Sequence, residues 1–290
     1  MSHVSVLLEC SLEYLAIRPD GIYVDATFGA GGHSQAILAK LTTGRLISID
    51  ADPQAIERAQ AIAHPCFTFV PANFSQLRSV LDQCNVEQVD GVLFDLGVSS
   101  MQLDSAERGF SFRESAPLDM RMNPNHGQSA YDILCNASER ELADIFFQYG
   151  EERAARRIAR AILERRAAGR LPKTTIEFAS FISGVVHRPG KRERIHPATR
   201  VFQALRIAVN EELDVFRIGI GAAIDSLRGA GRVVAISFHS LEDRIVKQTF
   251  RGDERLNILT KKPIVPEKRE MAENPRARSA KLRAAERKAS

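Results

Sequence analysis

A glycine-rich turn near the start of the chain and a carboxylate beyond it have the spacing of a nucleoside-binding site. The run Asp25-Ala-Thr-Phe-Gly-Ala-Gly-Gly-His33 follows an apolar segment and precedes a helical pattern. Glycines in such a turn let the backbone approach a ligand at the N-terminus of the helix. Asp50 ends the next apolar segment, 19 residues beyond Gly31, where a carboxylate can accept hydrogen bonds from ribose hydroxyls. Together, the turn and Asp50 indicate a bound nucleoside.

The glycine spacing discriminates between two kinds of cofactor. The pattern Gly29-x-Gly31-Gly32 lacks the third glycine of the dinucleotide motif, and the chain shows no second nucleotide half-site. A nicotinamide-dependent oxidoreductase built on the same sheet is therefore disfavoured. S-adenosylmethionine has no pyrophosphate and needs a close backbone turn for its amino-acid end, so the deviation favours this methyl donor.

Two further residues follow later apolar segments of strand length. Phe74 comes after the third of them and could pack on an adenine face, although an ordinary core aromatic is an equally good interpretation. Asp95 ends the fourth, at the edge where doubly wound sheets bind ligands. A carboxylate at the end of an apolar strand is seldom needed for folding, so Asp95 is the stronger candidate.

The elements that must position these residues alternate between strands and helices. Apolar runs predict strands at 22–26, 45–49, 67–70 and 89–94, and amphipathic stretches predict helices at 34–41, 53–63 and 75–83. This alternation predicts an α/β fold with a doubly wound parallel sheet.

The pattern changes after Ser100. Residues 104–127 predict an ordered loop, 130–209 are helical, and strand character returns at 231–237, with possible closing strands at 256–261 and 280–284. We therefore expect a discontinuous sheet domain, 1–103 with 211–290, interrupted by an all-helical domain at 104–210.

Several longer motifs resemble the RsmH family, also called MraW. They extend from Thr27 to Ser279, so the resemblance covers nearly the whole chain. The segments are Thr27-Phe-Gly-Ala-Gly-Gly-His-Ser34, Asp95-Leu-Gly-Val-Ser-Ser100, Gln102-Leu-Asp104, Arg108-Gly-Phe-Ser-Phe112, Pro117-Leu-Asp-Met-Arg-Met122, Tyr149-Gly-Glu-Glu-Arg153, His196-Pro-Ala-Thr-Arg200, Ser237-Phe-His-Ser-Leu-Glu-Asp-Arg244 and Asn274-Pro-Arg-Ala-Arg-Ser279.

The resemblance implies a class I (Rossmann-like) methyltransferase that uses S-adenosylmethionine. Its substrate would be the exocyclic N4 of a cytidine, cytosine-1402, in the decoding region of 16S ribosomal RNA. The family pattern assigns cofactor binding to Gly31, Gly32, His33, Asp50, Phe74, Asp95 and Gln102, all of which are present. Met101 stands where many relatives have proline, and the region 252–255 is short, so the details of these two loops do not carry over.

An exocyclic cytosine amine is a poor nucleophile because its lone pair is conjugated with the ring. We expect acceptors after the fourth strand, namely Asp95, Ser99 and backbone carbonyls, to bind the amine, so that positioning supplies most of the rate. His239 could act as acid or base beside Asp243. Ser237 or Ser240 could instead simply cap a helix there. Covalent catalysis would need a cysteine nucleophile, and Cys66 lies before the third strand, away from this edge.

Charge and composition suggest the partners. The net charge is +4, and from 251 to 290 there are 12 Lys or Arg against 6 Asp or Glu. This basic tail, Arg153, Arg156, Arg157 and Arg160, and the run 188–194 are candidate contacts to 16S RNA in the small subunit, or solvated charges.

No signal-like start, membrane-length apolar run or metal-ligand spacing is present. We therefore expect a cytoplasmic protein without membrane contact and with no metal-ligating site residues. The sequence does not reveal whether a metal assists at the RNA interface, and a homodimer is compatible with it. A ribosome assembly factor that keeps the fold without turnover, or a methyltransferase with a non-RNA substrate, are the alternatives.

Overall fold

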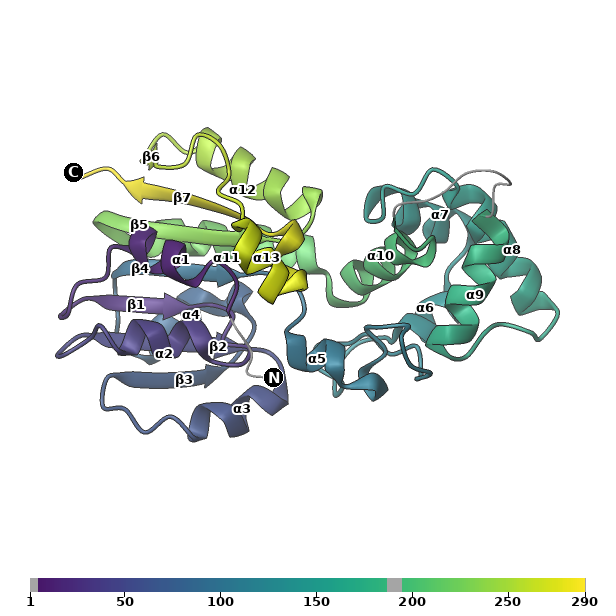
Figure 1. Cartoon of the computed structure of the whole chain (residues 1–290), viewed down its shortest axis with the longest axis horizontal. Helices are drawn as coiled ribbons and strands as arrows, with labels where there is room; N and C mark the ends of the chain where they lie inside the picture. The colour runs from purple at the N-terminus through teal and green to yellow at the C-terminus, as the bar shows by residue number, and fades with distance from the viewer. Residues whose placement is uncertain (1–4, 187–194, 290) are drawn as a thin grey trace. The chain divides into compact units, whose positions relative to one another are not determined.

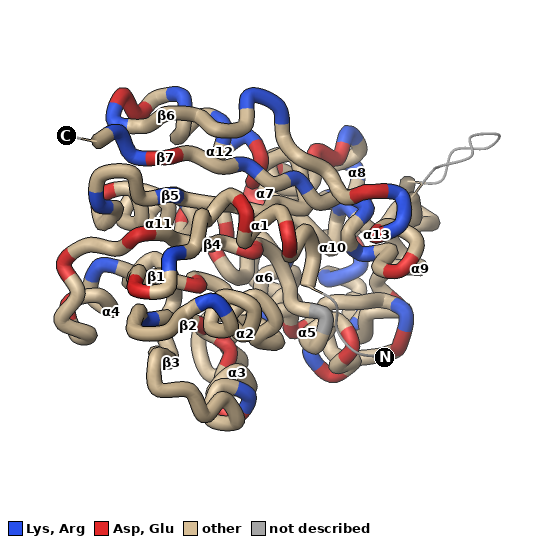
Figure 2. Tube along the Cα trace, turned by 60° about the vertical axis from the view of Figure 1, so that its left-hand side comes forward, with Lys and Arg blue, Asp and Glu red and all other residues tan. Residues whose placement is uncertain are grey.

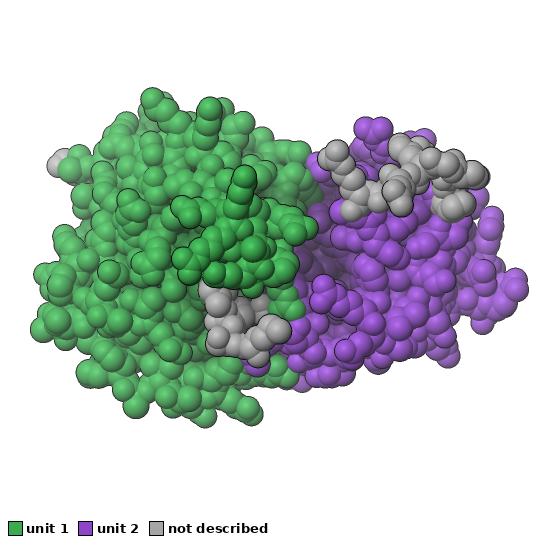
Figure 3. All heavy atoms as spheres, in the orientation of Figure 1, with its two compact units in different colours: residues 1–97, 213–290 green, residues 98–212 purple. Residues whose placement is uncertain are grey.

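The computed structural model describes residues 5–186 and 195–289 and divides the chain into two compact units. Unit 1 comprises residues 1–97 and 213–290, and unit 2 comprises residues 98–212 (Figure 3). The expected boundaries were at 103/104 and 210/211. Residues 98–103 belong to unit 2 because Val98 and Leu103 pack against its hydrophobic core.

Unit 1 contains a seven-stranded sheet with the order β3-β2-β1-β4-β5-β7-β6 (Figure 1). The strands are β1 (Ile22–Asp25), β2 (Arg45–Asp50), β3 (Phe67–Pro71), β4 (Val89–Asp95), β5 (Leu227–Ser237), β6 (Leu256–Ile258) and β7 (Lys281–Arg287). The first five are parallel, and β7 runs antiparallel to both β5 and β6. A dinucleotide-binding sheet has the order 3-2-1-4-5-6, so the antiparallel β7 between β5 and β6 distinguishes this chain from that fold.

The strand β5 begins earlier than the sequence pattern predicted. A strand was expected at 231–237, but β5 starts at Leu227. Its register against β4 shifts between Val89 and Gly91, and Ala230 has φ 62°. The glycine-rich stretch is therefore an irregularity inside a longer strand.

Helices cover both faces of this sheet. They are α1 (Leu8–Leu15), α2 (Gly32–Leu38), α3 (Pro53–Gln60), α4 (Leu77–Gln83), α11 (Glu212–Ser226), α12 (Ser240–Gly252) and α13 (Lys268–Glu273). Side chains alternate between faces along β4: Leu93 packs into the core under α1 and α2, whereas Phe94 meets Phe216 of α11 at 5.5 Å between ring centroids. The helices α1, α11 and α13 were not predicted. In α11, Gly219 and Gly221 weaken the helical signal.

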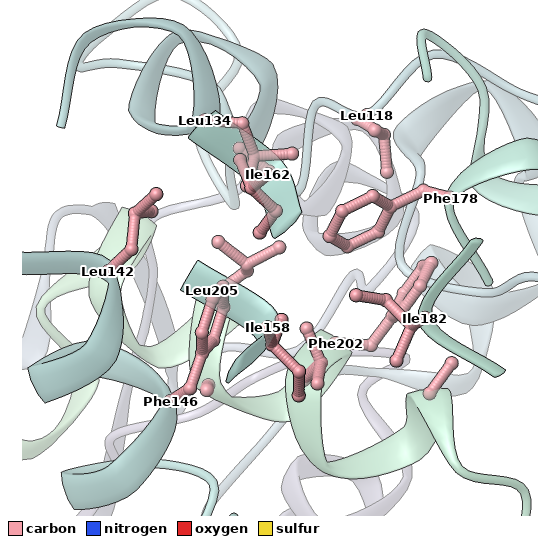
Figure 4. Close-up of a cluster of buried hydrophobic side chains, with 14 of the residues drawn as sticks. Leu118, Leu134, Leu142, Phe146, Ile158, Ile162, Phe178, Ile182, Phe202 and Leu205 are labelled. Carbon is pink, nitrogen blue, oxygen red and sulfur yellow. The ribbon is translucent and has the colours of Figure 1, made fainter. Parts of the chain in front are cut away.

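Unit 2 is helical around a core of its own (Figure 4). Its helices are α5 (Ser100–Asp104), α6 (Ala130–Asn136), α7 (Glu139–Gln148), α8 (Ala155–Ala167), α9 (Thr175–Val186) and α10 (Ala198–Asn210). Ser129 and Ser138 form capping boxes that begin α6 and α7. The segment predicted as a loop contains one 3-10 turn, η2 (Ala106–Arg108), and a single bridge from Pro117 to Thr174. Within the described residues, no helix combines the length and apolar character needed to cross a membrane.

Candidate cofactor site

The glycine turn lies between β1 and α2, and its shape depends on missing side chains. Gly31 is the N-terminal cap of α2 with φ 81°, and a Cβ there would lie 2.9 Å from Cζ of Phe28. A Cβ on Gly32 would collide with Oγ of Ser5. Gly31 is therefore needed for the conformation of the turn, whereas Gly32 leaves room for the N-terminal segment of the chain.

Asp50 closes the turn from the end of β2. One carboxylate oxygen accepts a hydrogen bond from the backbone N of Gly29 at 2.7 Å, and the other accepts from the N of Asp52 at 2.8 Å. Burial raises the pKa of Asp50, and these two hydrogen bonds oppose the shift. Each oxygen retains acceptor capacity, so the carboxylate can hold the turn and accept ribose hydroxyls together.

Asp95 ends β4 next to the glycine turn. Its backbone N donates to Oγ1 of Thr27 at 2.6 Å, and one carboxylate oxygen, Oδ2, lies 3.5 Å from Nδ1 of His33. The other oxygen, Oδ1, is buried and has no hydrogen-bond partner among the described residues. Burial, with added repulsion from Asp25 and Glu242, raises the pKa of Asp95 to about 8.

His33 links Asp95 to the N-terminal segment. Its Nε2 lies 3.2 Å from the carbonyl oxygen of Val6, and the ring is buried. A carbonyl only accepts hydrogen bonds, so Nε2 carries a hydrogen. The other ring nitrogen, Nδ1, faces Oδ2 of Asp95.

Asp25 is a buried carboxyl group that the sequence prediction left without a role. It accepts hydrogen bonds from Oγ of Ser34 at 2.6 Å and from the N of Thr27 at 3.1 Å, and Ser34 also contacts Ser48 at 2.8 Å. Burial raises its pKa to about 6 despite these hydrogen bonds. Its position at the end of the first apolar strand, like Asp50 and Asp95 on theirs, was the available signal.

Phe74 lies at the start of a 3-10 turn, η1 (Phe74–Gln76), after β3. Its half-buried ring meets Phe94 edge-on at 5.7 Å and Phe216 at 6.4 Å between centroids. A Cβ on Gly219 of α11 would lie 2.7 Å from Cδ2 of Phe74. The ring thus has a packing role on one side, and adenine binding by Phe74 stays a prediction.

Ser99 and Gln102 form a capping box at the start of α5 in unit 2. The backbone N of Gln102 donates to Oγ of Ser99 at 3.2 Å, and the N of Ser99 donates to the Gln102 side chain at 3.0 Å. The structure thus shows a local helix-capping role for both side chains. Their roles in binding substrate and cofactor stay predictions.

His239 is the N-terminal cap of α12, in place of the Ser237 or Ser240 suggested by the sequence. Its Nδ1 accepts from the backbone N of Glu242 at 3.4 Å, and Nε2 lies 3.2 Å from Oε1 of Glu242. The Glu242 carboxylate in turn accepts from the N of Phe238 at 2.8 Å. Both ring nitrogens therefore face Glu242, one turn along the same helix.

Asp243 has a different partner. It accepts a hydrogen bond of 2.6 Å from Arg283 on β7. Burial would raise the pKa of Asp243, but the Arg283 guanidinium and Lys281 hold it below its usual value. Asp243 therefore joins α12 to β7 and is not positioned as a partner for His239.

The basic residues proposed to contact RNA divide into paired and exposed groups. Arg160 lies 3.6 Å from Glu139, whereas Arg153, Arg156 and Arg157 are exposed on unit 2. In the tail, both basic and acidic residues occur along β7 and next to β6 (Figure 2). Arg255 pairs with Asp225 and Asp253, Arg283 with Asp243, and Arg287 donates to the Ile224 carbonyl. Some of the charged residues in the tail therefore form contacts within the protein itself. The run 188–194 lies outside the described residues.

The site in unit 1 fits S-adenosylmethionine. Contacts connect the glycine turn to Asp50 and His33 to Asp95. The Phe74 ring contacts the ring of Phe94, which precedes Asp95 in β4. Asp50 can hold ribose hydroxyls, and the unpartnered Oδ1 of Asp95 can accept from a ligand. The sheet order with an antiparallel β7, together with these groups at the carboxyl ends of the parallel strands, defines a class I S-adenosylmethionine-dependent methyltransferase.

Comparison with known proteins agrees with this class. The chain belongs to the MraW methylase family, whose model matches residues 1–288. It is 48% identical to the ribosomal RNA small subunit methyltransferase H of Caldicellulosiruptor bescii, with 98% of each chain covered. It is 50% identical to the protein of the same name from Geobacter sulfurreducens, again with 98% of each chain covered.

Proposed function

We propose that this protein methylates the exocyclic N4 of a cytidine in the decoding region of 16S ribosomal RNA, at cytosine-1402. The curated relatives that share about half of its residues over 98% of the chain are named as small-subunit ribosomal RNA methyltransferases, which supports the substrate. In this proposal the protein works in the cytoplasm on RNA within the small subunit, and the helical unit 2 recognises that RNA.

The observation that carries the chemistry is the unpartnered Oδ1 of Asp95 at the end of β4. S-adenosylmethionine, when bound, supplies the methyl group as an electrophile. The amine must lose conjugation with the ring and then release a proton, so hydrogen-bond acceptors around the nitrogen promote the reaction. Asp95 is a suitable acceptor. Ser99, at the start of unit 2, is proposed as a further acceptor. His239 serves first as a helix cap, and its catalytic role is tested separately.

The test uses small ribosomal subunits from cells lacking this protein, incubated with labelled S-adenosylmethionine and then digested to nucleosides. We expect label in N4-methylcytidine, with mapping of the RNA to locate the position. The Asp95→Asn variant should lose at least tenfold in rate, whereas Asp20→Asn at an exposed position should retain it. Label in another nucleoside overturns the substrate.

Binding of subunits without transfer would favour the assembly-factor alternative. Protein-free 16S RNA, tested in parallel, distinguishes free RNA from the assembled subunit as substrate. Label in neither RNA substrate, with cofactor binding intact, would favour a non-RNA substrate. Sedimentation of the purified protein tests for a homodimer.

A further inference from the structure

Unit 2 carries a groove of about 920 Å³ between the end of α8 and the exposed side of α9. We call it the α8–α9 groove and define it by Arg165, Arg170, Lys173, Glu177, Phe181 and Gly184. Its volume is at the upper end of the range for small-molecule sites. The core residues of unit 2 do not fill it, so the groove is a surface available to a ligand.

The charge of the groove is positive and unpaired. Arg165, Arg170 and Lys173 form no ion pair with a carboxylate in the described part of the chain. The single carboxylate, Glu177, accepts hydrogen bonds from the backbone N of Lys173 at 3.1 Å and of Thr174 at 3.2 Å. These hydrogen bonds lower the pKa of Glu177 and hold its carboxylate at the start of α9. The charge of Lys173 also lowers the pKa of Glu177. Because three cations face one carboxylate in the groove, a net positive charge remains for an anionic ligand.

An aromatic ring accompanies these cations. Phe181 is half-buried, and the guanidinium carbon of Arg165 lies 5.5 Å from its ring centroid. Phe178, in the core of unit 2, lies 6.3 Å from Phe181 between ring centroids. The guanidinium of Arg165 lies over the Phe181 ring, and an unstacked nucleobase can stack on such an arginine–aromatic pair.

The backbone of α9 is open toward solvent at Gly184. Among the described atoms, none outside its own helix lies within 4 Å of the position that a Cβ would take. A larger side chain at 184 would therefore fill part of the groove without a steric conflict in the fold. This position offers a way to block the groove while all of its charges stay in place.

We propose that the α8–α9 groove binds a single-stranded segment of the substrate RNA, with a base stacked at Phe181 and Arg165 and phosphates at Arg170 and Lys173. The inference rests on the proposed function and names the site through which unit 2 would contact the RNA. An acidic peptide would satisfy the charge but would not use the ring. A duplex keeps its bases stacked on each other, so the ring favours a single strand.

The experiment measures binding of a fluorescent ten-nucleotide single-stranded RNA to the full-length protein by anisotropy at several salt concentrations. We expect Phe181→Leu and Gly184→Leu to weaken binding about tenfold. Lys173→Gln should reduce the slope of log affinity against log salt by about 0.7, the value for one single-strand phosphate contact. Thermal unfolding of each variant checks that the fold is retained.

The matched controls lie outside the groove. Arg140→Gln removes one charge from α7 of the same unit, where the side chain is 94% exposed, and Gly221→Leu adds the same side chain at an open helical position in α11. Both should bind the RNA as the parent protein does. Equal affinity and salt slope in the groove variants and the controls would overturn the proposal.

Two further outcomes distinguish this proposal from its alternatives. If the groove variants bind the RNA normally but methylate assembled subunits poorly, the groove contacts a ribosomal protein and the RNA assignment is wrong. If the parent protein transfers methyl to subunits while the groove variants match it in both assays, the proposed function stands and only the groove assignment fails.

Discussion

Asp95 is the residue whose environment departs most from that of a surface carboxyl group. Its side chain is 23% exposed, yet Oδ1 is buried, and Asp25 and Glu242 repel its negative charge. His33 is the titratable group in contact with Asp95. Burial favours the neutral form and raises the pKa of Asp95, so a ligand that prefers the charged form would lower this pKa.

The raised pKa predicts how stability without cofactor depends on pH. A carboxyl whose pKa rises on folding stabilises the protein below its ordinary pKa near 4, and this contribution is lost as pH rises toward 8. Asp25 loses its own contribution at lower pH, because its pKa is about 6. Between pH 6.5 and 8.5, we expect the melting temperature of the parent protein to fall by a few degrees more than that of the Asp95→Asn variant.

Scanning fluorimetry of both proteins across this range measures the difference. The difference reports on Asp95 and its contact with His33, because the remaining titrating groups are common to the two proteins. Parallel curves would show that Asp95 is already ionised in the folded protein.

The glycine turn allows a second prediction with a matched control. Gly31 and Gly127 have φ of 81° and 79°, but only Gly31 has a neighbour, Phe28, where a Cβ would go; at Gly127 no described atom lies within 4 Å. Both Ala variants should carry the left-handed backbone penalty of about 1–2 kcal/mol. Gly31→Ala should additionally weaken S-adenosylmethionine binding at least tenfold in calorimetry. Equal affinities in the two variants would show that the turn does not hold the cofactor.

At the level of elements, α12 shows how one residue type can have a structural or a chemical role. The His239 ring caps the helix, and Asp243 connects its first turn to β7. The strand β7 is the antiparallel element that characterises the sheet. Capping therefore affects the region that carries Glu242, which raises the pKa of Asp95.

Two substitutions at position 239 separate capping from catalysis. His239→Ala should lower stability by about 0.5–2 kcal/mol through loss of the cap, whereas His239→Asn should restore most of it. If the residue acts through positioning, methyl transfer by the Asn variant should lie within a few-fold of the parent rate. A large loss of turnover in the His239→Asn variant, with stability and cofactor binding retained, would instead assign acid–base chemistry to His239.

At the level of the whole molecule, each of the two units has a hydrophobic core of its own among the described residues. The core of unit 2 consists of residues between 98 and 212, and the core of unit 1 combines the two ends of the chain. Each unit can therefore unfold as its own cooperative block. A ligand that binds only one folded unit stabilises that unit alone.

This organisation predicts two transitions in scanning calorimetry. S-adenosylmethionine at 100 times its dissociation constant should stabilise unit 1 by about 2.7 kcal/mol and raise only that transition. Leu142→Ala should lower only the transition temperature of unit 2, because Leu142 is fully buried in the core of that unit. A single transition that moves as a whole in both experiments would show that the two units unfold together.

The sequence by itself determined the elements that depend on local patterns. The first four strands appear within two residues of their predicted ends, because each is a short apolar run bounded by polar or glycine residues. The helical interruption before β5 was also predicted, since its apolar residues recur at helical spacing. The turn from Asp25 to His33 could be recognised because its glycines are adjacent in the chain.

Only the tertiary structure decided which side chains meet. Gly32 accommodates Ser5, the Phe74 ring packs on α11, and Asp243 pairs with an arginine 40 residues away. Burial raises the pKa of Asp95, and carboxylates from β1 and α12 add to the shift. Desolvation and charge act through space, so their effects depend on distances between residues far apart in the chain, which local sequence patterns do not contain.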